Sequence, residues 1–271
     1  YLLDFSHGLR LTTSAYYNYF WRNWYKLNDV RIGYRTGEKR TIEQILADPE
    51  ASADYFAILT GVKDADGEAN QRSYHSRGIQ TKLEYRLPLL SGMLDLEAGA
   101  RYHADLEDRF QHEDSYAMHG GQMELYRAGL PGNQSNRITT AHAFASYLLG
   151  KWSNGRWTLT AGLRLEDVDL IKRDYTAKDP RRTGHLRIDG SNHATALLPS
   201  FGVNYKLLRP LSIFAGVHQG FAPPSVLTYY RQKAEKSINL EAGLRLSTPT
   251  LKVEAIAYHN AYSNMLGSDL A

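Results

Sequence analysis

The chain has 271 residues, no cysteine, 19 tyrosines, 22 glycines and a formal net charge of +3. Its mean hydropathy is -0.47, and no uninterrupted apolar run approaches the ~20 residues that a membrane-spanning helix needs, which excludes a helical membrane protein. The charge is too balanced to indicate a nucleic-acid partner. The absence of cysteine fits a chain that crosses an oxidising compartment.

Residues 9–27 form the first predicted strand, because their side chains alternate between apolar and polar. The apolar side consists of Leu9, Leu11, Ala15, Tyr17, Tyr19 and Trp21. The polar side consists of Arg10, Thr12, Ser14, Asn18, Arg22 and Lys26. Aromatic residues crowd towards the end of this arm, as they do where a transmembrane strand leaves the hydrocarbon. An ordinary core patch of a soluble sheet would give the same cluster.

Residues 28–76 are predicted to be a long loop that contains helices, since a loop of this length rarely lacks structure in a compact domain. Thr41 and Gln44 form a capping box ahead of the sequence IEQILA. Asp48 and Pro49 then start a second helical segment. We expect residues 41–61 to be helical and to lie outside the membrane, above the mouth of a barrel.

Residues 78–87 and 93–106 are the next two arms, and residues 137–170 form a hairpin with much longer arms than a soluble sandwich needs. The remaining arms are residues 199–207, 211–220, 236–246 and 251–263. Short turns fall at residues 88–92, 153–156, 208–210 and 247–250, and every connection between them is longer. Short and long connections that alternate strictly indicate an antiparallel transmembrane β-barrel with long extracellular loops, of which this chain holds about nine strands.

The alternation also predicts which residues face lipid and which face a watery interior. The lipid side is expected to carry Leu94, Leu96, Leu159, Leu163, Ile213, Val217, Val253 and Ile256. The interior is expected to carry Arg101, Arg164, Glu166, Glu241 and Arg245. Charged residues in this number need water, because an unpaired charge in a closed core costs several kcal/mol.

Residues 107–136 are predicted to be a second long loop, and histidines and carboxylates gather around its start. The residues concerned are His103, Asp105, Asp108, His112, Asp114 and His119. Their density permits a metal site. Because none of them shows the tight repeated spacing of a zinc motif, a solvated acidic loop is the favoured interpretation.

Several segments resemble the barrel signatures of TonB-dependent outer-membrane receptors: TAGLRLED, VHQGFAPPS and EKSINLEAGLRLSTPTLKVEAIAYHNAYSNML. Others are similar to the ferric-citrate receptor branch, especially its Bacteroidetes-type members: RNWYKLND, RSYHSRGIQ, ARYHADLEDRF, SNRITTAHAFASY and KRDYTAKDPRRTG. The order and spacing of these segments make the resemblance specific, and it covers nearly the whole chain. It implies a middle section, residues 1–271, of a barrel of the 22-stranded plugged class, without the plug domain and the C-terminal strands.

The resemblance implies an outer-membrane receptor of a Gram-negative bacterium that takes up an iron complex, either ferric citrate or a similar anionic siderophore. Iron would be carried in the transported ligand, so no cofactor of the protein itself is expected. The implied partners are TonB–ExbB–ExbD, reached through the missing N-terminal part, and the lipid and lipopolysaccharide of the outer membrane. The alternatives are a receptor for haem or an oligosaccharide on the same fold, and then a simple pore or adhesin. No motif for an enzyme is present.

The ligand site implied by the resemblance consists of arginines near the outer ends of the strands. Arg22 and Arg72 match the branch motif to motif, and Arg137 matches within a few positions. A forked guanidinium suits the carboxylates of an anionic complex better than lysine does. The opposing interpretation is that each arginine only pairs with a loop carboxylate or a lipopolysaccharide phosphate.

Overall fold

The computed structural model describes residues 1–5, 8–27, 29–32, 38–60, 65–119, 122–185, 187–226 and 233–265, with the backbone alone at residues 25–26, 65–71 and 118–119. Its short elements are β1 (Leu2–Asp4), β3 (Asp29–Arg31), β4 (Lys39–Thr41), α1 (Ile42–Ala47), α2 (Ala53–Leu59) and β7 (Gln122–Arg127). Its long strands are β2 (Leu9–Lys26), β5 (Ala65–Leu89), β6 (Gly92–His119), β8 (Ser135–Ser153), β9 (Trp157–Asp174), β10 (Ile188–Lys206), β11 (Leu211–Ala222), β12 (Glu235–Ser247) and β13 (Lys252–Ser263).

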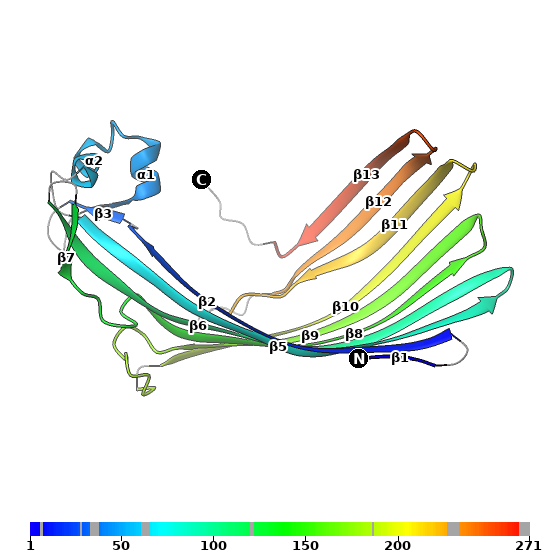
Figure 1. Ribbon diagram of the computed structural model, residues 1–271, viewed down its shortest axis with the longest axis horizontal. Helices are drawn as coiled ribbons and strands as arrows, with labels where there is room; N and C mark the ends of the chain where they lie inside the picture. Colours follow the sequence, from blue (N-terminus) through cyan, green and yellow to red (C-terminus); the bar gives the residue numbers. More distant parts are fainter. Residues whose placement is uncertain are drawn as a thin grey trace.

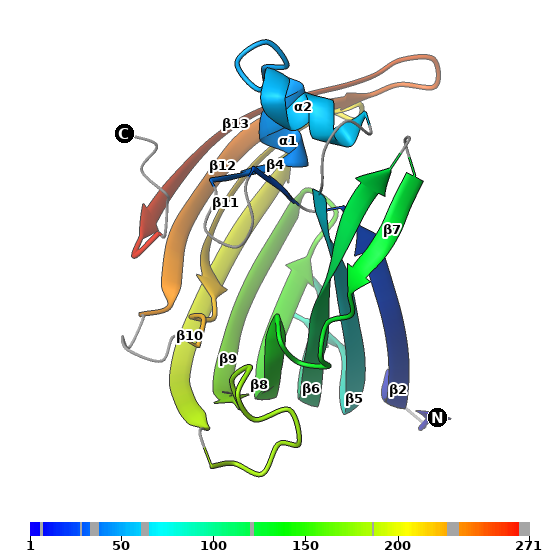
Figure 2. The same cartoon turned by 90° about the vertical axis from the view of Figure 1, so that its left-hand side faces the viewer.

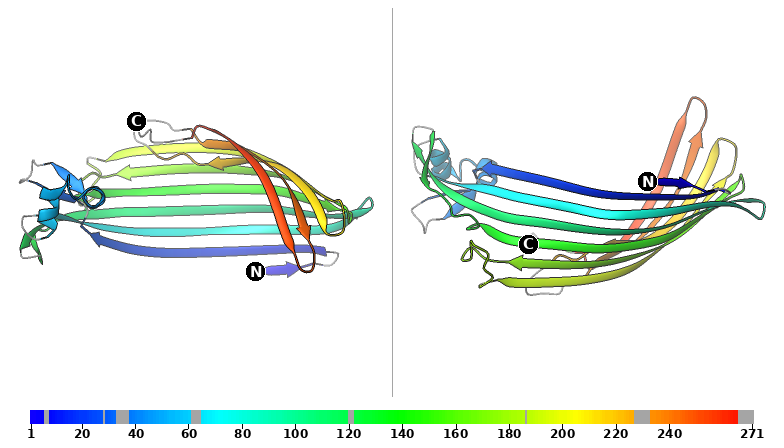
Figure 3. Two further views of the ribbon diagram at one scale, coloured as in Figure 1. Left: turned by 90° about the horizontal axis from the view of Figure 1, so that it is seen from above. Right: turned by 60° about the horizontal axis from the view of Figure 1, so that its bottom comes forward.

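The strands form one antiparallel sheet, in which β1, β2, β5, β6, β8, β9, β10, β11, β12 and β13 follow one another and β7 pairs with β6. The sheet is curved into a trough that stays open along its length (Figure 1; Figure 3). The chain is therefore all-β, as predicted, and the sheet is an unclosed section of barrel wall. A separate pair of strands, β3 and β4, lies beside the two helices.

The connections are sorted by length between the two ends of the sheet. The turns after β5, β8, β10 and β12 all lie at one end, and the long connections after β2, β6, β9 and β11 all lie at the other (Figure 1). All four predicted turns are confirmed. Tight turns opposite long loops are the arrangement of a transmembrane barrel.

Three predicted loop boundaries are wrong, because the strands continue well past the apolar alternation. β5 begins at Ala65, so the last part of the loop predicted at residues 28–76 belongs to a strand. β6 continues to His119 and pairs with β7, so the segment 107–136 is mainly a continuation of the sheet. β10 begins at Ile188 and not at Pro199. Backbone hydrogen bonds continue the strand pairing beyond the apolar band. Neither face of a strand has to be apolar there, so the sequence shows no alternation that would predict the strand.

The capping box at the start of α1 is confirmed. The Gln44 backbone N–H donates to the Thr41 hydroxyl at 3.2 Å, and the Thr41 N–H donates to the Gln44 side chain at 2.9 Å. The second helix starts at Ala53 and not at Asp48, because the Asp48 carboxylate accepts from the Ala51 N–H at 3.0 Å and holds a turn there.

Helices α1 and α2 have a small core of their own, formed by Val30, Ile45, Tyr55 and Ile58. Both helices lie at the long-loop end of the sheet (Figures 1 and 2), as expected for the segment 41–61. They have six and seven residues, and no helix among the described residues has the length and apolar character to cross a membrane.

The strand register divides the side chains between two faces, since directly paired residues on neighbouring strands share a face. We call the face that carries Arg101, Arg164, Glu166, Glu241 and Arg245 the inner face; these five residues share it, as predicted. The opposite, outer face carries seven of the eight predicted lipid-side residues: Leu94, Leu96, Leu159, Leu163, Ile213, Val217 and Val253.

Ile256 is the exception and lies on the inner face, because it pairs with Gly243, which stands between Glu241 and Arg245. Val253 pairs with Leu246 on the outer face. Two residues three positions apart on one strand must point to opposite faces. The prediction that both face lipid was therefore wrong for Ile256.

The inner face is the more shielded of the two. On this face, the exposed fractions of Ala145, Val168 and Ala196 are only 5%, 7% and 3%. On the outer face, Leu148, Leu163 and Phe201 keep 58%, 47% and 50%. Curvature crowds the side chains of a concave surface together, so the charged inner face is the inside of the trough.

The segment after β9 is held against β6 by Arg182. Its guanidinium donates to both Asp108 carboxylate oxygens at 2.9 and 2.6 Å, and its Nε donates to Asn136 at 2.7 Å. The guanidinium also lies 4.6 Å from the centre of the Phe110 ring. The contact is mostly buried, so we treat it as the attachment of this loop to the wall.

The change Arg182→Ala should release this loop while leaving the barrel intact. Hydrogen bonds to charged groups are each worth about 1.5–3 kcal/mol, so amide hydrogen exchange across residues 175–185 should speed up by about tenfold or more. Mass spectrometry of the full-length protein measures this exchange. The control is Arg181→Ala, because Arg181 is the exposed neighbour of Arg182. Equal exchange rates in both variants would contradict the role of Arg182 in attaching this loop.

Candidate functional site

Four arginines lie side by side on the inner face at the long-loop end. Arg22 of β2 pairs directly with Arg72 of β5, Arg72 with Arg109 of β6, and Arg109 with Arg137 of β8. Neighbouring strands are about 4.8 Å apart, so the four side chains start from one continuous line across the sheet. We call these four residues the arginine row.

The structure thus brings together all three arginines predicted from the sequence, Arg22, Arg72 and Arg137. Arg109 was missed because it fell within the segment 107–136, which was interpreted as a loop. Its signal was present: charged or polar residues continue at alternate positions from Arg101 to Arg109. Extending that alternation past the apolar band would have placed Arg109 on the inner face.

One carboxylate, Glu107, lies within the arginine row. The Arg109 Nε donates to the Glu107 Oε1 at 2.8 Å, and the Arg72 Nη1 is 3.8 Å from the same oxygen. Beyond Arg137 the line continues to Asp174 on β9, whose carboxylate pairs with Lys172 at 3.2 Å. The row therefore carries more positive charge than these neighbours neutralise.

The two ends of the row, Arg22 and Arg137, each keep a buried Nε without a hydrogen-bond partner. A buried donor left unsatisfied is uncommon in folded proteins and calls for an acceptor. The Arg22 guanidinium is 4.3 Å from the centre of the Trp24 ring and 5.4 Å from that of Tyr74, which fixes its plane. Burial, followed by the charge of Arg109, lowers the pKa of Arg137 from its ordinary value, although an arginine stays protonated at neutral pH.

A hollow of about 300 Å³ adjoins the row towards the short-turn end of the sheet. Its inner-face lining consists of Tyr74, Ser76, Asp105, Glu107, Thr139 and Ala141. The small side chains of β5 and β8 leave the space, and the row forms its rim. If the arginines held the anionic group of a ligand, the rest of that ligand would fit into this hollow.

The metal site permitted by the sequence around residues 103–119 does not assemble among the described side chains. His103 pairs with Asp105 at 2.8 Å and His112 with Asp114 at 3.5 Å, but no third ligand joins either pair. The side chain of His119 lies outside the described part of the chain. The expectation of a solvated, ion-paired segment describes these two pairs better.

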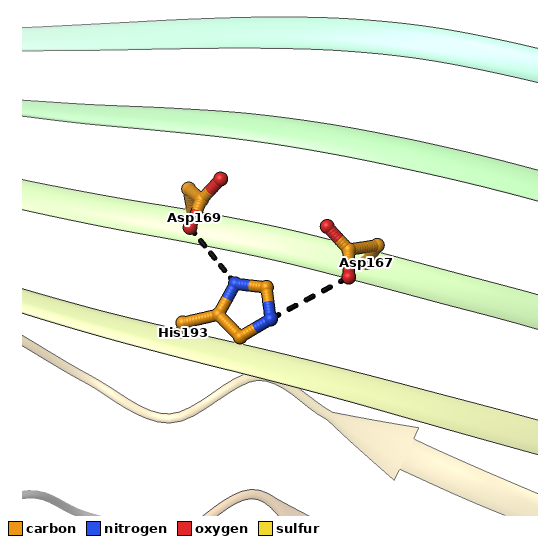
Figure 4. Close-up of side chains that lie close together, drawn as sticks. All are labelled: Asp167, Asp169 and His193. Carbon is orange, nitrogen blue, oxygen red and sulfur yellow. Dashed lines mark hydrogen bonds and ion pairs between the residues drawn. The ribbon is translucent and has the colours of Figure 1, made fainter.

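One group of metal-ligand type does assemble, and it lies elsewhere, on the outer face of β9 and β10. Asp167, Asp169 and His193 place their ligand atoms within 4.8 Å of one another. The His193 ring lies between the two carboxylates, with Nδ1 2.8 Å from Asp169 and Nε2 3.5 Å from Asp167 (Figure 4). Because its two nitrogens point to different carboxylates, the ring bridges the two aspartates.

Fold and site together define a class. The sheet has an apolar outer face and a charged inner face. Its tight turns lie at one end, and its long loops lie at the other end together with the arginine row. These are the features of a transmembrane β-barrel with long loops at one end.

The whole chain, residues 1–271, matches the family model described as TonB dependent receptor-like, beta-barrel, and the chain belongs to this family. A search of curated protein sequences finds no match. Among solved structures, the chain is similar to the ferric citrate transporter FecA in its unliganded form, with a TM-score of 0.63 and 17% identity. It is also similar to the siderophore receptor PiuA from Acinetobacter baumannii (TM-score 0.69, 12% identity) and to the ferric-catecholate import receptor Fiu from E. coli K12 (0.65, 12%).

The alignments cover 96%, 95% and 97% of this chain but only 33%, 38% and 40% of those proteins. The chain thus spans about two fifths or less of the length of the structures it matches. At these identities the likeness establishes the fold. The family and its structural neighbours are transporters and receptors and not enzymes, and the chain is part of a TonB-dependent receptor barrel.

Proposed function

We propose that the full-length protein takes up an anionic iron complex, ferric citrate or a similar siderophore, and binds it at the arginine row. The observation that carries the proposal is the line of Arg22, Arg72, Arg109 and Arg137 on the inner face. Among the side chains that the structure describes, Glu107 is the carboxylate that lies within this line. Guanidinium groups donate in a fork that matches carboxylate oxygens. The arginine row lies at the long-loop end of the sheet, which supports entry of the ligand from that side.

The printed names of the structural neighbours, a ferric citrate transporter and two receptors for siderophores or ferric catecholates, support this substrate class. The iron would be cargo, coordinated by the chelator and not by the protein. Passage inward would depend on TonB–ExbB–ExbD, engaged by a part of the receptor outside this chain. The outer face would contact the lipid and lipopolysaccharide of a Gram-negative outer membrane.

The double substitution Arg22→Ala with Arg72→Ala in the full-length receptor tests the site. Loss of two charge-assisted contacts, each worth about 1.5–3 kcal/mol, should weaken ferric citrate binding by about 100-fold or more. Calorimetric titration of the purified receptor measures the affinity, and growth on ferric citrate as the iron source measures uptake.

The matched control is Arg77→Ala on β5. Arg77 lies five residues from Arg72 and faces outward, because it pairs with Ala104 on the strand face opposite to His103. This variant should bind ferric citrate like the unchanged receptor. Full binding by the double variant, with the barrel assembled, would remove the row as the ligand site.

A further inference from the structure

Two aspartates and a histidine gather on the outer face of β9 and β10, where a lipid-facing wall leads one to expect apolar side chains. Asp169 is the direct register partner of His193, and Asp167 lies two residues earlier on the same face of β9. One ligand atom from each of the three residues lies within 4.8 Å of the others. Figure 4 shows the imidazole between the two carboxylates. We call these three residues the outer-face triad.

The outer-face triad lies at the edge of the apolar band and is open to water. A tilted strand needs about 9–11 residues to cross the hydrocarbon, so a crossing that begins at Trp157, the first residue of β9, ends close to Asp167. The outward side chains of β9 are apolar as far as Leu165. The side chains of Asp167, Asp169 and His193 are 40%, 60% and 55% exposed. Dissolved ions can therefore reach the triad.

Neighbouring residues hold and extend this set of ligand atoms. Thr195, the direct partner of Asp167, donates its hydroxyl to the Asp167 carboxylate at 2.8 Å. On its other side, Asp169 pairs directly with His142 of β8, so a histidine lies next to it on both neighbouring strands. The Tyr102 hydroxyl is 2.8 Å from the His142 Nδ1, which leaves Nε2 as the ligand atom of that ring. Hydrogen-bonded partners of this kind orient the ligands of metal sites.

The charge of the triad calls for a second positive charge. Asp167 and Asp169 bring two negative charges, and among the described side chains only His193 pairs with them. A protonated imidazole would leave one net negative charge at the edge of the hydrocarbon, where an unpaired charge is costly. A divalent cation bound by both carboxylates and a neutral imidazole would leave none.

We propose that Asp167, Asp169 and His193 bind a divalent transition-metal cation such as Zn²⁺ on the outer surface of the barrel. A mixed set of imidazole and carboxylate ligands suits such ions, whereas Ca²⁺ and Mg²⁺ favour oxygen ligands alone. His142 is the candidate fourth ligand, since directly paired residues have Cβ atoms about 4.5–5.5 Å apart. The site is on the opposite face of the sheet from the arginine row and does not depend on the proposed function.

The distances within the triad fit one ion after small side-chain movements. Zn²⁺ lies about 2.0–2.2 Å from nitrogen and oxygen ligands in a tetrahedral arrangement, which puts the ligand atoms about 3.4 Å from one another. The ligand atoms of the triad are already within 4.8 Å. Rotation of the exposed carboxylates about their side-chain bonds closes the remaining gap, while the paired backbones of β9 and β10 stay where they are.

The experiment is a calorimetric titration of the full-length receptor with Zn²⁺, on protein purified in detergent without a histidine tag. The unchanged receptor should bind Zn²⁺ at this site. Asp169→Asn and His193→Gln should each weaken that binding by at least about tenfold, because each removes one ligand and keeps the size of the side chain. X-ray absorption at the zinc edge should show imidazole and oxygen ligands, and the imidazole contribution should fall in His193→Gln.

The matched controls are Asp189→Asn and His75→Gln, which make the same two changes elsewhere on the outer face. Asp189 pairs with Arg187 at 2.8 Å, and the His75 Nδ1 is 2.8 Å from the Tyr17 hydroxyl. Both control variants should bind Zn²⁺ like the unchanged receptor. Unboiled gel mobility reports an assembled barrel, so it identifies any variant that has lost binding through misfolding.

The proposal is overturned if the unchanged receptor does not bind Zn²⁺, or if Asp169→Asn and His193→Gln bind it as well as the two controls do. A parallel titration with Ca²⁺ tests the class of ion. Binding of Ca²⁺ in place of Zn²⁺, lost in Asp169→Asn and kept in His193→Gln, would overturn the proposal by showing a site of oxygen ligands alone.

Discussion

Replacing Arg109 with glutamate is expected to lower the affinity of the full-length receptor for ferric citrate by more than 100-fold. Arg109 stands between Arg72 and Arg137 and donates to Glu107 at 2.8 Å. The substitution removes one guanidinium from the middle of the row and puts a second carboxylate beside Glu107. Lost charge-assisted contacts of about 1.5–3 kcal/mol each and the new repulsion act in the same direction. Titration of the purified receptor with ferric citrate measures the effect.

Arg173→Glu is the matched control for that experiment. Arg173 is at the same end of the sheet, but it pairs with Ile138 on the outer face. The substitution Arg173→Glu makes the same change in net charge as Arg109→Glu, but it leaves the arginine row unchanged. If the two variants lose affinity equally, the effect comes from the overall charge of the mouth, and the row has no special role.

Replacing Leu148 with arginine is expected to destabilise the folded barrel in a bilayer by about 2–4 kcal/mol, the cost of a cation near the membrane midplane. Leu148 is 58% exposed on the outer face, between Ala98 and Leu163. It lies midway between the outward aromatic residues Phe144 and Trp152 of β8. Denaturant titration of the full-length protein refolded into lipid vesicles measures the loss.

The neighbouring change Leu149→Arg supplies the comparison, because it makes the identical substitution one residue later. Leu149 lies on the inner face and pairs with Glu97. An arginine there would gain a carboxylate in a watery interior, so the stability should change by less than about 1 kcal/mol. Equal losses at both positions would show that the assignment of the two faces is wrong.

Three of the four arginines in the row could be predicted from the sequence. These are Arg22, Arg72 and Arg137, although 115 positions separate the first from the last. Their direct pairing through Arg109 was not foreseen. Strand ends outside the membrane lack an apolar side, so the period-two signal fades there although hydrogen bonding between β5, β6 and β8 continues.

The alternation of side chains determined the sheet, its antiparallel hairpins, the positions of the four short turns and the face of nearly every residue in the apolar band. It could do so because lipid on one side and water on the other impose a local pattern on each strand. Register, by contrast, is a relation between strands, and a shift of one residue would turn a side chain to the opposite face. Only the tertiary structure decided that four arginines from β2, β5, β6 and β8 form one row, since that depends on how far each strand extends and against which residue its neighbour pairs.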